Sequence, residues 1–227
     1  MKVFCVDRRH CMLLLLPVIF LFSSIYAHNT AYNLADKVIV IDAGHGGIDP
    51  GANRPNILEK DINLAVALQL KEKLNHYGAR VVLSRQSDVE LSEECDNEKV
   101  QGRYHRDLAA RVEMAEESDA DLFISIHANA VTNAKRHGAE VFYSKKSDGS
   151  KALADAIQGE LCKVTQANRT AKTADYFVLS RNKIPAVLIE VGFITNLDER
   201  TMLQKPEYQL KLAEAIAKGV HSFYRQI

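Results

Sequence analysis

The sequence predicts a single α/β domain built on a largely parallel sheet. Six short apolar runs typical of buried strands alternate with amphipathic patterns typical of helices, and this alternation is characteristic of parallel strands joined by crossover helices. The chain has 227 residues, which is enough for a short targeting segment and one domain with a sizeable core. Its composition, with 47% hydrophobic and 26% charged residues, is ordinary for a globular protein.

The individual elements follow from the periodicity of the apolar residues. Strands are expected at Val38–Ile41, Arg80–Leu83, Leu122–Ile126, Glu140–Tyr143, Phe177–Leu179 and Ala186–Ile189. The clearest helix is INLAVALQLKEKLNHYG, which places an apolar stripe on one face and ends at Gly78. The stripe consists of Ile62, Val66, Leu70 and Leu74. Further helices are expected at Leu108–Ala115, Ala152–Cys162 and Tyr208–Phe223.

The N-terminal residues have the pattern of a secretory signal peptide. A basic start is followed by an uncharged apolar run from Met12 to Ile25, and then by small residues and Ala27. The run is short for a membrane span. We therefore expect a signal peptide over residues 1–27, a short linker over 28–36 and the single folded domain over 37–227, in a protein exported to the periplasm or cell envelope. An uncleaved anchor is the alternative, and the sequence leaves cleavage open.

The charge balance argues against nucleic acid as a partner. The chain has 29 basic and 29 acidic residues, and no run of lysines and arginines offers a surface for phosphates. Outside the N-terminal segment two cysteines remain, Cys95 and Cys162. An exported protein could pair them, but the sequence does not give their separation.

Ionisable side chains follow three of the expected strands directly. His45 lies among glycines in VIVIDAGHGGIDPGA, His127 ends LFISIH, and Glu190 ends AVLIE. Ligands of α/β sheets bind outside the carboxyl ends of the strands. Because the fold brings these ends together, the three residues predict a functional site.

Two histidines and a carboxylate, with a fourth position open for water, are typical of a catalytic zinc ion. Structural zinc sites usually have four protein ligands, often cysteines, and no Cys-x-x-Cys pair is present. The carboxylate must come from a residue near one of the histidines. Glu59 is a candidate, and Asp61 and Asp49 are rivals that position alone does not separate.

The motifs IDAGHGGIDPGA, EKDINLA, SIHANA and PAVLIEVGFITN resemble those of the zinc-dependent N-acetylmuramoyl-L-alanine amidases of the amidase 3 family, in the same order, between about Lys37 and Tyr224. The resemblance implies that one Zn²⁺ per chain is held by His45, Glu59 and His127, and that Glu190 is the catalytic base. It implies a six-stranded mixed sheet flanked by helices. It also implies cleavage of the amide between N-acetylmuramic acid and the L-alanine of the stem peptide, in peptidoglycan or its precursors, with roles in the cell wall and cell division.

These residue types suit that reaction. Zinc lowers the pKa of a bound water toward ~7 and polarises a carbonyl, and a carboxylate such as Glu190 can pass the water's proton to the leaving amine. Asp42, Asn129 and Asn196 are candidates for orienting the ligands or binding substrate. Capping or turn hydrogen bonds explain these three residues equally well.

Regulation is less evident from the sequence. Many relatives carry a wall-binding module or an inhibitory insert between the second histidine and the catalytic glutamate. Here this interval is 63 residues long and has no such insert. We expect a monomer, and any activator or regulatory protein is unknown. An acidic stretch between Asp88 and Glu98 is interpreted as a solvated loop, with a lid or docking loop over Leu91–His105 as the alternative.

Two other functions are suggested by parts of the sequence. Ser180 and Lys183 have the S-x-x-K spacing of penicillin-binding serine enzymes, which would add a D,D-carboxypeptidase activity. About one such match is expected by chance, and that motif normally begins a helix in a different fold. A wall-binding domain without turnover is the non-enzymatic alternative, but mere binding would not require the two histidines together with Glu59 and Glu190.

Overall fold

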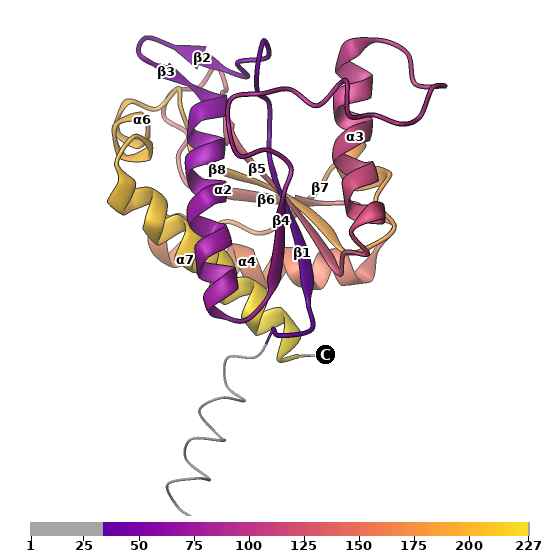
Figure 1. Cartoon of the computed structure of the whole chain (residues 1–227). Coiled ribbons are helices and arrows are strands. Elements are labelled where there is room, and N and C mark those ends of the chain that lie inside the picture. Colours follow the sequence, from indigo (N-terminus) through magenta and orange to yellow (C-terminus); the bar gives the residue numbers. More distant parts are fainter. Residues whose placement is uncertain (1–33, 227) are drawn as a thin grey trace, which may run out of the picture. The chain divides into compact units, whose positions relative to one another are not determined.

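A six-stranded sheet runs through the middle of the structure, a computed structural model that describes residues 34–226 (Figure 1). The strand order is β4-β1-β5-β8-β6-β7, and every neighbouring pair is parallel except β6 and β8. The mixed, mostly parallel sheet expected above is therefore confirmed. The strands are β1 (Val38–Ala43), β4 (Arg80–Leu83), β5 (Leu122–Asn129), β6 (Glu140–Tyr143), β7 (Lys172–Thr173) and β8 (Ala186–Phe193).

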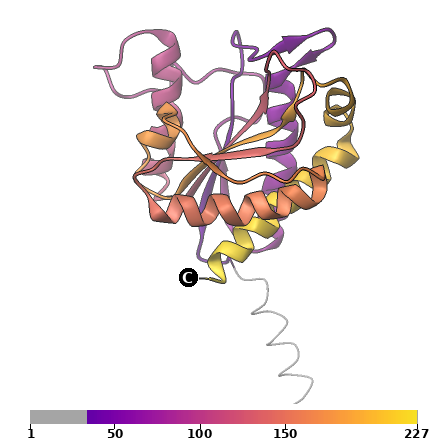
Figure 2. The ribbon, with the colours of Figure 1, turned by 180° about the vertical axis from the view of Figure 1, so that it is seen from behind.

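Helices cover both faces of this sheet. The larger apolar core packs one face against α2 (Glu59–His76), α4 (Asp148–Thr165) and α7 (Pro206–Tyr224), and Figure 2 shows α4 and α7 crossing each other. A smaller core packs the other face against α3 (Arg103–Glu117) and α5 (Phe177–Ser180). The short helix α6 (Leu197–Leu203) follows β8.

The helix α2 shows how the apolar stripe determines packing. All four residues of the predicted stripe are buried in the larger core. After the helix, Gly78 takes a φ of 93°, a conformation that glycine adopts without steric cost, and the chain turns directly into β4. The helix begins at Glu59, three residues before the predicted Ile62.

One predicted strand is wrong. Phe177–Leu179 belongs to the short helix α5, where the amides of Leu179 and Ser180 both donate to the carbonyl of Tyr176. Val178 and Leu179 are buried in the smaller core, so the apolar run reflects burial and not an extended backbone, an ambiguity inherent to short runs. The sixth strand is β7, whose two residues are exposed and carry no apolar pattern.

Several smaller features complete the fold. A two-stranded hairpin, β2 (Asn53–Arg54) with β3 (Ile57–Leu58), precedes α2 and was not predicted. Leu34, expected in the linker, is buried in the larger core. The predicted signal segment and residues 28–33 lie outside the described residues.

The two cysteines of the domain do not pair. Cys95 and Cys162 are both free, and Cys95 is buried in a small cluster with Leu91, Ala109 and Ala110. Within residues 34–226, none of the helices has the length and apolar character needed to cross a membrane.

Candidate metal centre

His45 lies in the turn that follows β1, and two buried arginines fix its backbone. Its φ is 62°, an uncommon value for a residue with a side chain. From α3, Arg111 Nη2 donates to the carbonyl of His45 at 2.9 Å. Arg85, just after β4, donates through Nε to the carbonyl of Ala43 at 2.9 Å and through Nη2 to that of Gly44 at 3.1 Å. The strained turn is therefore held from both sides.

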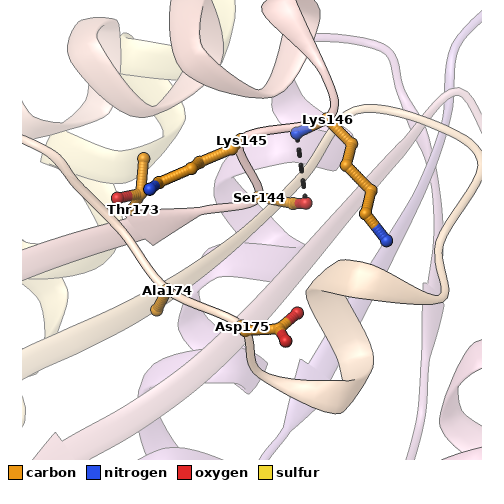
Figure 3. A pocket seen from close by; sticks show the side chains of 6 residues that line it. All are labelled: Ser144, Lys145, Lys146, Thr173, Ala174 and Asp175. Atoms are coloured by element: carbon orange, nitrogen blue, oxygen red, sulfur yellow. Dashed lines mark hydrogen bonds between the residues drawn. The ribbon is translucent and has the colours of Figure 1, made fainter.

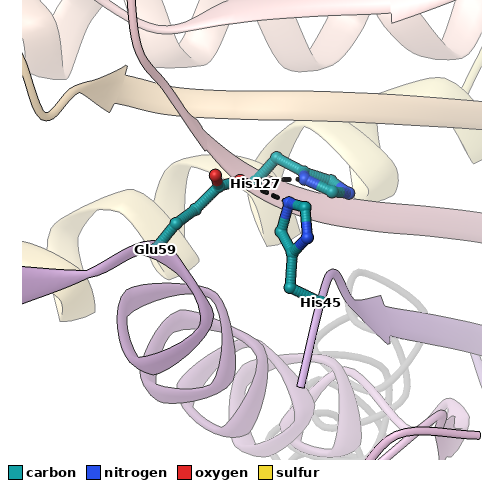
Figure 4. A group of neighbouring side chains, drawn as sticks. All are labelled: His45, Glu59 and His127. Carbon is teal, nitrogen blue, oxygen red and sulfur yellow. Dashed lines mark hydrogen bonds and ion pairs between the residues drawn. The ribbon is translucent and has the colours of Figure 1, made fainter. Parts of the chain in front are cut away.

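Glu59 and His127 approach His45 from two other elements (Figure 4). Glu59 is the first residue of α2, and His127 lies near the end of β5. Glu59 Oε1 is 3.2 Å from His45 Nε2 and 3.0 Å from His127 Nδ1. One ligand atom of each residue lies within 4.8 Å of the other two. This spacing lets one small cation contact all three, and the donor set of two imidazoles and a carboxylate is one that zinc prefers.

The glycines beside the group allow this close approach. A Cβ on Gly44 would overlap the imidazole of His127, and a Cβ on Gly51 would lie 2.7 Å from both Glu59 Oε2 and His45 Cδ2. Gly51 also has a φ of 64°, which disfavours other residues. Side chains at these two positions would displace the candidate ligands. Glycines are therefore found around His45 because larger residues would collide with the candidate ligands.

Hydrogen bonds orient the side chains of His45 and Glu59 from outside. Asp49 Oδ2 lies 2.7 Å from His45 Nδ1, the ring nitrogen that faces away from Glu59. Both carboxylate oxygens of Glu59 accept backbone hydrogen bonds, Oε2 from Ala52 at 2.8 Å and Oε1 from Ala128 at 3.2 Å. Asn63 Nδ2 contacts Glu59 Oε1 at 3.4 Å. Such outer partners fix the tautomer and the direction of a metal-binding side chain.

The geometry separates Glu59 from its two rivals. Asp49 orients His45 and is not among the three converging groups, and Asp61 is exposed on α2. The rest of the orienting set is formed by Asn63, Arg85 and Arg111, which sequence reasoning missed. No local motif marks the arginines, because their contacts with the His45 turn span more than 40 residues of chain.

The protonation states of the group reflect its crowding. Burial lowers the pKa of His45, but the hydrogen bonds and charges of Glu59 and Asp49 outweigh it and raise that pKa to about 9. Burial raises the pKa of Glu59, but the two histidines hold it far below its usual range. Without a metal, the imidazole of His45 is protonated at neutral pH and forms an ion pair with the carboxylate of Glu59. A divalent cation would replace that proton, so the residues present fit a metal ion.

Glu190 lies next to this group by strand register. On β8 it pairs with His127 of β5 on one side and with Glu140 of β6 on the other, so the three side chains share one face of the sheet. Burial, followed by the nearby charge of Glu59, raises the pKa of Glu190 to about 8. Its Oε2 atom is buried and has no hydrogen-bond partner among the described residues. The carboxyl group is therefore positioned to hold or release a proton near neutral pH.

The candidate orienting residues Asp42, Asn129 and Asn196 lie in three different environments. Asp42 is buried beneath the His45 turn and accepts hydrogen bonds from Arg111 and Ser125, so it contacts the site only through Arg111. Asn129 lies on β5, two residues after His127, with its amide 3.5 Å from Glu140. Asn196 caps α6 by accepting from the amides of Asp198 and Glu199.

The serine–lysine pair is not assembled. The hydroxyl of Ser180 faces the carbonyl of Phe177 at 3.4 Å, at the end of α5, whereas the ammonium of Lys183 is 2.8 Å from Glu116. The two side chains thus have different partners, and Ser180 ends a helix instead of beginning one. Nothing in this arrangement activates the hydroxyl as a nucleophile.

The acidic stretch before α3 is tied down at several points. Asp88 Oδ1 accepts from the amide of Gly47 at 2.8 Å, beside the His45 turn. Farther along, the amide of Leu91 donates to Asp107, and Arg106 donates to the carbonyls of Ser92 and Cys95. The segment is thus anchored both to α3 and to the turn that carries His45.

A separate pocket of about 460 Å³ lies at the other end of β6 (Figure 3). It is lined by Ser144, Lys145, Lys146, Thr173, Ala174 and Asp175. Glu140, at the start of β6, pairs with Glu190, whereas Tyr143, just before the pocket, pairs with Val187. The pocket is therefore distinct from the candidate metal centre.

Known proteins share both the sequence and the fold. The family model described as N-acetylmuramoyl-L-alanine amidase matches residues 39–222. The germination-specific N-acetylmuramoyl-L-alanine amidase of Bacillus subtilis is 38% identical over 216 residues, which cover 92% of this chain and 91% of the relative.

Two solved structures extend the comparison. The CwlD amidase of Clostridioides difficile, in complex with the GerS lipoprotein, is 42% identical with a TM-score of 0.79, and the match covers 85% of this chain and 100% of that one. The catalytic domain of the amidase CwlV from Bacillus (Paenibacillus) polymyxa is 32% identical with a TM-score of 0.71, over 83% of this chain and 98% of that one. The resemblance noted from the motifs is confirmed, and zinc dependence is general in this family. The chain therefore belongs to the N-acetylmuramoyl-L-alanine amidases, hydrolases that cleave the peptidoglycan bond between N-acetylmuramic acid and L-alanine.

Proposed function

We propose that this chain is a zinc-dependent peptidoglycan amidase in which His45, Glu59 and His127 hold one Zn²⁺ and Glu190 is the general base. The observation that carries the proposal is the convergence of three ligand atoms within 4.8 Å of one another, from β5, α2 and the turn after β1. Glu190 lies directly beside them in the register of β5 and β8.

The chain's own residues account for binding and proton transfer. His45 and His127 point ring nitrogens at Glu59 Oε1, and Asp49 holds the outer nitrogen of His45. A zinc ion bound there lowers the pKa of water and polarises a carbonyl. Glu190 then takes a proton from the attacking water and returns it to the nitrogen of L-alanine as the amide bond breaks.

The protonation state of Glu190 suits this role. With a pKa of about 8 in the metal-free protein, the carboxyl group is mostly protonated at neutral pH. Positive charge nearby lowers the pKa of a carboxyl group, which favours the ionised form that a general base requires. The buried Oε2, which has no partner within the described chain, is then free to accept the proton.

The place of action follows from the relatives and the N-terminal pattern. The similar proteins are cell-wall amidases, and we propose that residues 1–27 direct this chain out of the cytoplasm to the cell envelope. One structural neighbour was solved in complex with a lipoprotein, and we propose that this chain also binds a lipoprotein partner. Co-purification of tagged full-length chain from its own cells, followed by mass spectrometry, tests the partner.

Mass spectrometry of peptidoglycan fragments tests the reaction. Purified protein is incubated with purified peptidoglycan as isolated, after chelation, and after zinc is restored. We expect free stem peptides with an L-alanine amino terminus in the first and third samples and none in the second. Cleavage within the glycan, or full release of stem peptides in the chelated sample, would overturn the proposal.

A further inference from the structure

Three cations surround one buried carboxylate beside the candidate active site. Glu140 Oε1 accepts from Arg136 Nη2 at 2.7 Å, from Arg169 Nη1 at 2.6 Å and from Lys172 Nζ at 2.6 Å. We name these four residues the Glu140 cluster. Its cations come from three separate stretches of chain, the segment before β6, the loop after α4, and β7. The fold thus gathers them at one point.

The Glu140 cluster carries more positive charge than its carboxylate neutralises. Two arginines, one lysine and one glutamate carry a formal net charge of +2. Glu140 is 2% exposed, whereas the side chains of Arg136 and Lys172 are 40% and 45% exposed. The anion is therefore enclosed and the excess cations face solvent.

The two guanidinium groups are held in place. The ring of Phe193 lies under both, with its centroid 5.2 Å from Arg136 Cζ and 5.4 Å from Arg169 Cζ, a cation–π arrangement. Arg169 also donates to the carbonyl of His137. The backbone amide of Arg136 donates to the carbonyl of Asn133, and in the described part of the chain its guanidinium group donates only to Glu140. Its remaining N–H groups are available to an anion.

Strand register places the Glu140 cluster next to the catalytic machinery. Glu140 pairs with Glu190 across β6 and β8, and Glu190 pairs with His127 across β8 and β5. Residues paired in this way have Cβ atoms about 4.5–5.5 Å apart on the same face. The amide of Asn129 lies between, 3.5 Å from Glu140 Oε2. A substrate bound at Glu190 therefore passes close to these cations.

The surrounding charges indicate what the Glu140 cluster binds. Arg136 and Lys172 are 40% and 45% exposed, so an anion that reaches this edge of the sheet is stabilised beside them. We propose that the Glu140 cluster, with Arg136 and Lys172 as its exposed arms, binds a carboxylate on the peptide arm of the substrate. This inference rests on the proposed function. The carboxyl group of muramic acid is itself part of the bond to be cleaved, so the carboxylates of intact substrate lie on the peptide arm.

The alternative is that the cations serve only to neutralise Glu140. One cation suffices for that purpose, and here three converge on the same oxygen. The two explanations differ in their consequences for substrate choice. Neutralisation predicts equal loss for every substrate when a cation is removed, whereas binding predicts loss only when the substrate carries the carboxylate.

Three synthetic substrates distinguish them. Each is a muramoyl dipeptide with L-alanine followed by glutamate, with both glutamate carboxylates free, only the α-carboxylate amidated, or only the γ-carboxylate amidated. The zinc-loaded protein should have about tenfold lower kcat/KM on one of the two amides, the scale of a charge-assisted contact at a partly exposed site. The sensitive amide identifies the bound carboxylate. Equal rates on all three substrates would overturn the inference and leave the proposed function standing, whereas no cleavage of any would overturn both.

Variants locate the effect on the protein. In Arg136→Gln and in Lys172→Gln, the ratio of kcat/KM between the free and the sensitive amidated substrate should fall toward one. Lys151→Gln removes an exposed cation on α4 that pairs with Asp155, and its ratio should equal that of the wild type. A ratio in Arg136→Gln and Lys172→Gln that stays at the wild-type value would assign the Glu140 cluster a structural role. The wild-type comparison remains decisive even if a variant does not fold.

Discussion

Glu59 at the start of α2 and Glu190 on β8 are the same residue type on two sides of one site, yet their surroundings push them in opposite directions. Glu59 has two histidines within 3.2 Å, and its pKa lies well below the usual range although burial alone would raise it. Among residues 34–226, Glu190 has no hydrogen-bond partner at its buried Oε2, and burial raises its pKa to about 8. Paired carboxyl groups with opposite shifts are typical of sites that divide binding and proton transfer between them.

The hydrogen bonds around the two residues differ in the same way. Both oxygens of Glu59 accept backbone amides, from Ala52 and Ala128, which fixes the carboxylate as a ligand requires. Glu190 keeps an unpaired oxygen, which a proton acceptor requires. The carboxylate of Glu59 is thus fixed and ionised, whereas the carboxyl group of Glu190 holds an exchangeable proton. The predictions below test this division.

The largest loss of activity is expected when one of the three proposed zinc ligands is replaced. Glu59→Gln, His45→Ala and His127→Ala should each lose bound zinc and lower peptide release by at least about a thousandfold, because a catalytic zinc site of this type has three protein ligands. Zinc content by atomic emission and release of L-alanine amino termini provide the measurements. Glu72→Gln, at an exposed position of the same helix, should retain both. A ligand variant with normal zinc content would contradict the assignment.

Glu190→Gln should separate the two regions. This substitution keeps the shape of the side chain and removes its basicity, so kcat should fall by about 10²–10⁴-fold while zinc content stays at the wild-type level. The same two assays apply. Loss of zinc in this variant would show that Glu190 belongs with the ligands and would remove the distinction from Glu59.

The next effect concerns the support beneath His45. Arg111 is 2% exposed and joins Asp42, Asp107 and the carbonyl of His45. Arg111→Met leaves Asp42 buried without its cation, which should lower the free energy of unfolding by about 3–5 kcal/mol. Urea denaturation measures the change. Arg111→Met combined with Asp42→Asn should recover part of the loss, and no recovery would mean that the buried charge is not its source.

The last prediction is a pH dependence of stability in the chelated protein. The folded protein holds a proton on Glu190 up to a pKa of about 8, against an ordinary value of 4.5, and on His45 up to about 9, against 6.5. In both cases the folded state binds more protons than the unfolded state, so stability falls as pH rises, between about 4.5 and 8 for Glu190 and between about 6.5 and 9 for His45.

Thermal unfolding from pH 5 to pH 9 in the presence of chelator measures this dependence. The Tm of the wild type should fall across the range, and Glu190→Gln should flatten the part below pH 8. Identical slopes for the two proteins would show that the pKa of Glu190 is not raised in the folded state.

The strand ends and the site edge could be predicted from the sequence because they depend on local patterns. Apolar runs marked β1, β5 and β8, and the residues that follow or end them, His45, His127 and Glu190, lie together in the structure. Their chemical roles are proposals that the variants test. The three acidic candidates could not be separated by their position in the sequence, because only the folded chain shows that Glu59 lies beside both imidazoles.

Contacts between segments that lie far apart in the chain could not be predicted from the sequence. Arg111 reaches the His45 turn across 66 residues, and the cations of the Glu140 cluster come from separate segments. Exposed β7 carries no apolar signal, whereas the apolar run at Phe177 belongs to a helix buried by α3. In each case tertiary packing determines the outcome, and a one-dimensional pattern does not record which segments meet.

Titration of chelated protein with zinc tests the central claim most directly. Peptide release from purified peptidoglycan is followed as zinc is added to the metal-free chain. The account predicts no release at the start, a linear rise, and a plateau at one zinc per chain, with the plateau absent in Glu59→Gln. Full release by the metal-free protein, or a plateau at two or more equivalents, would contradict it.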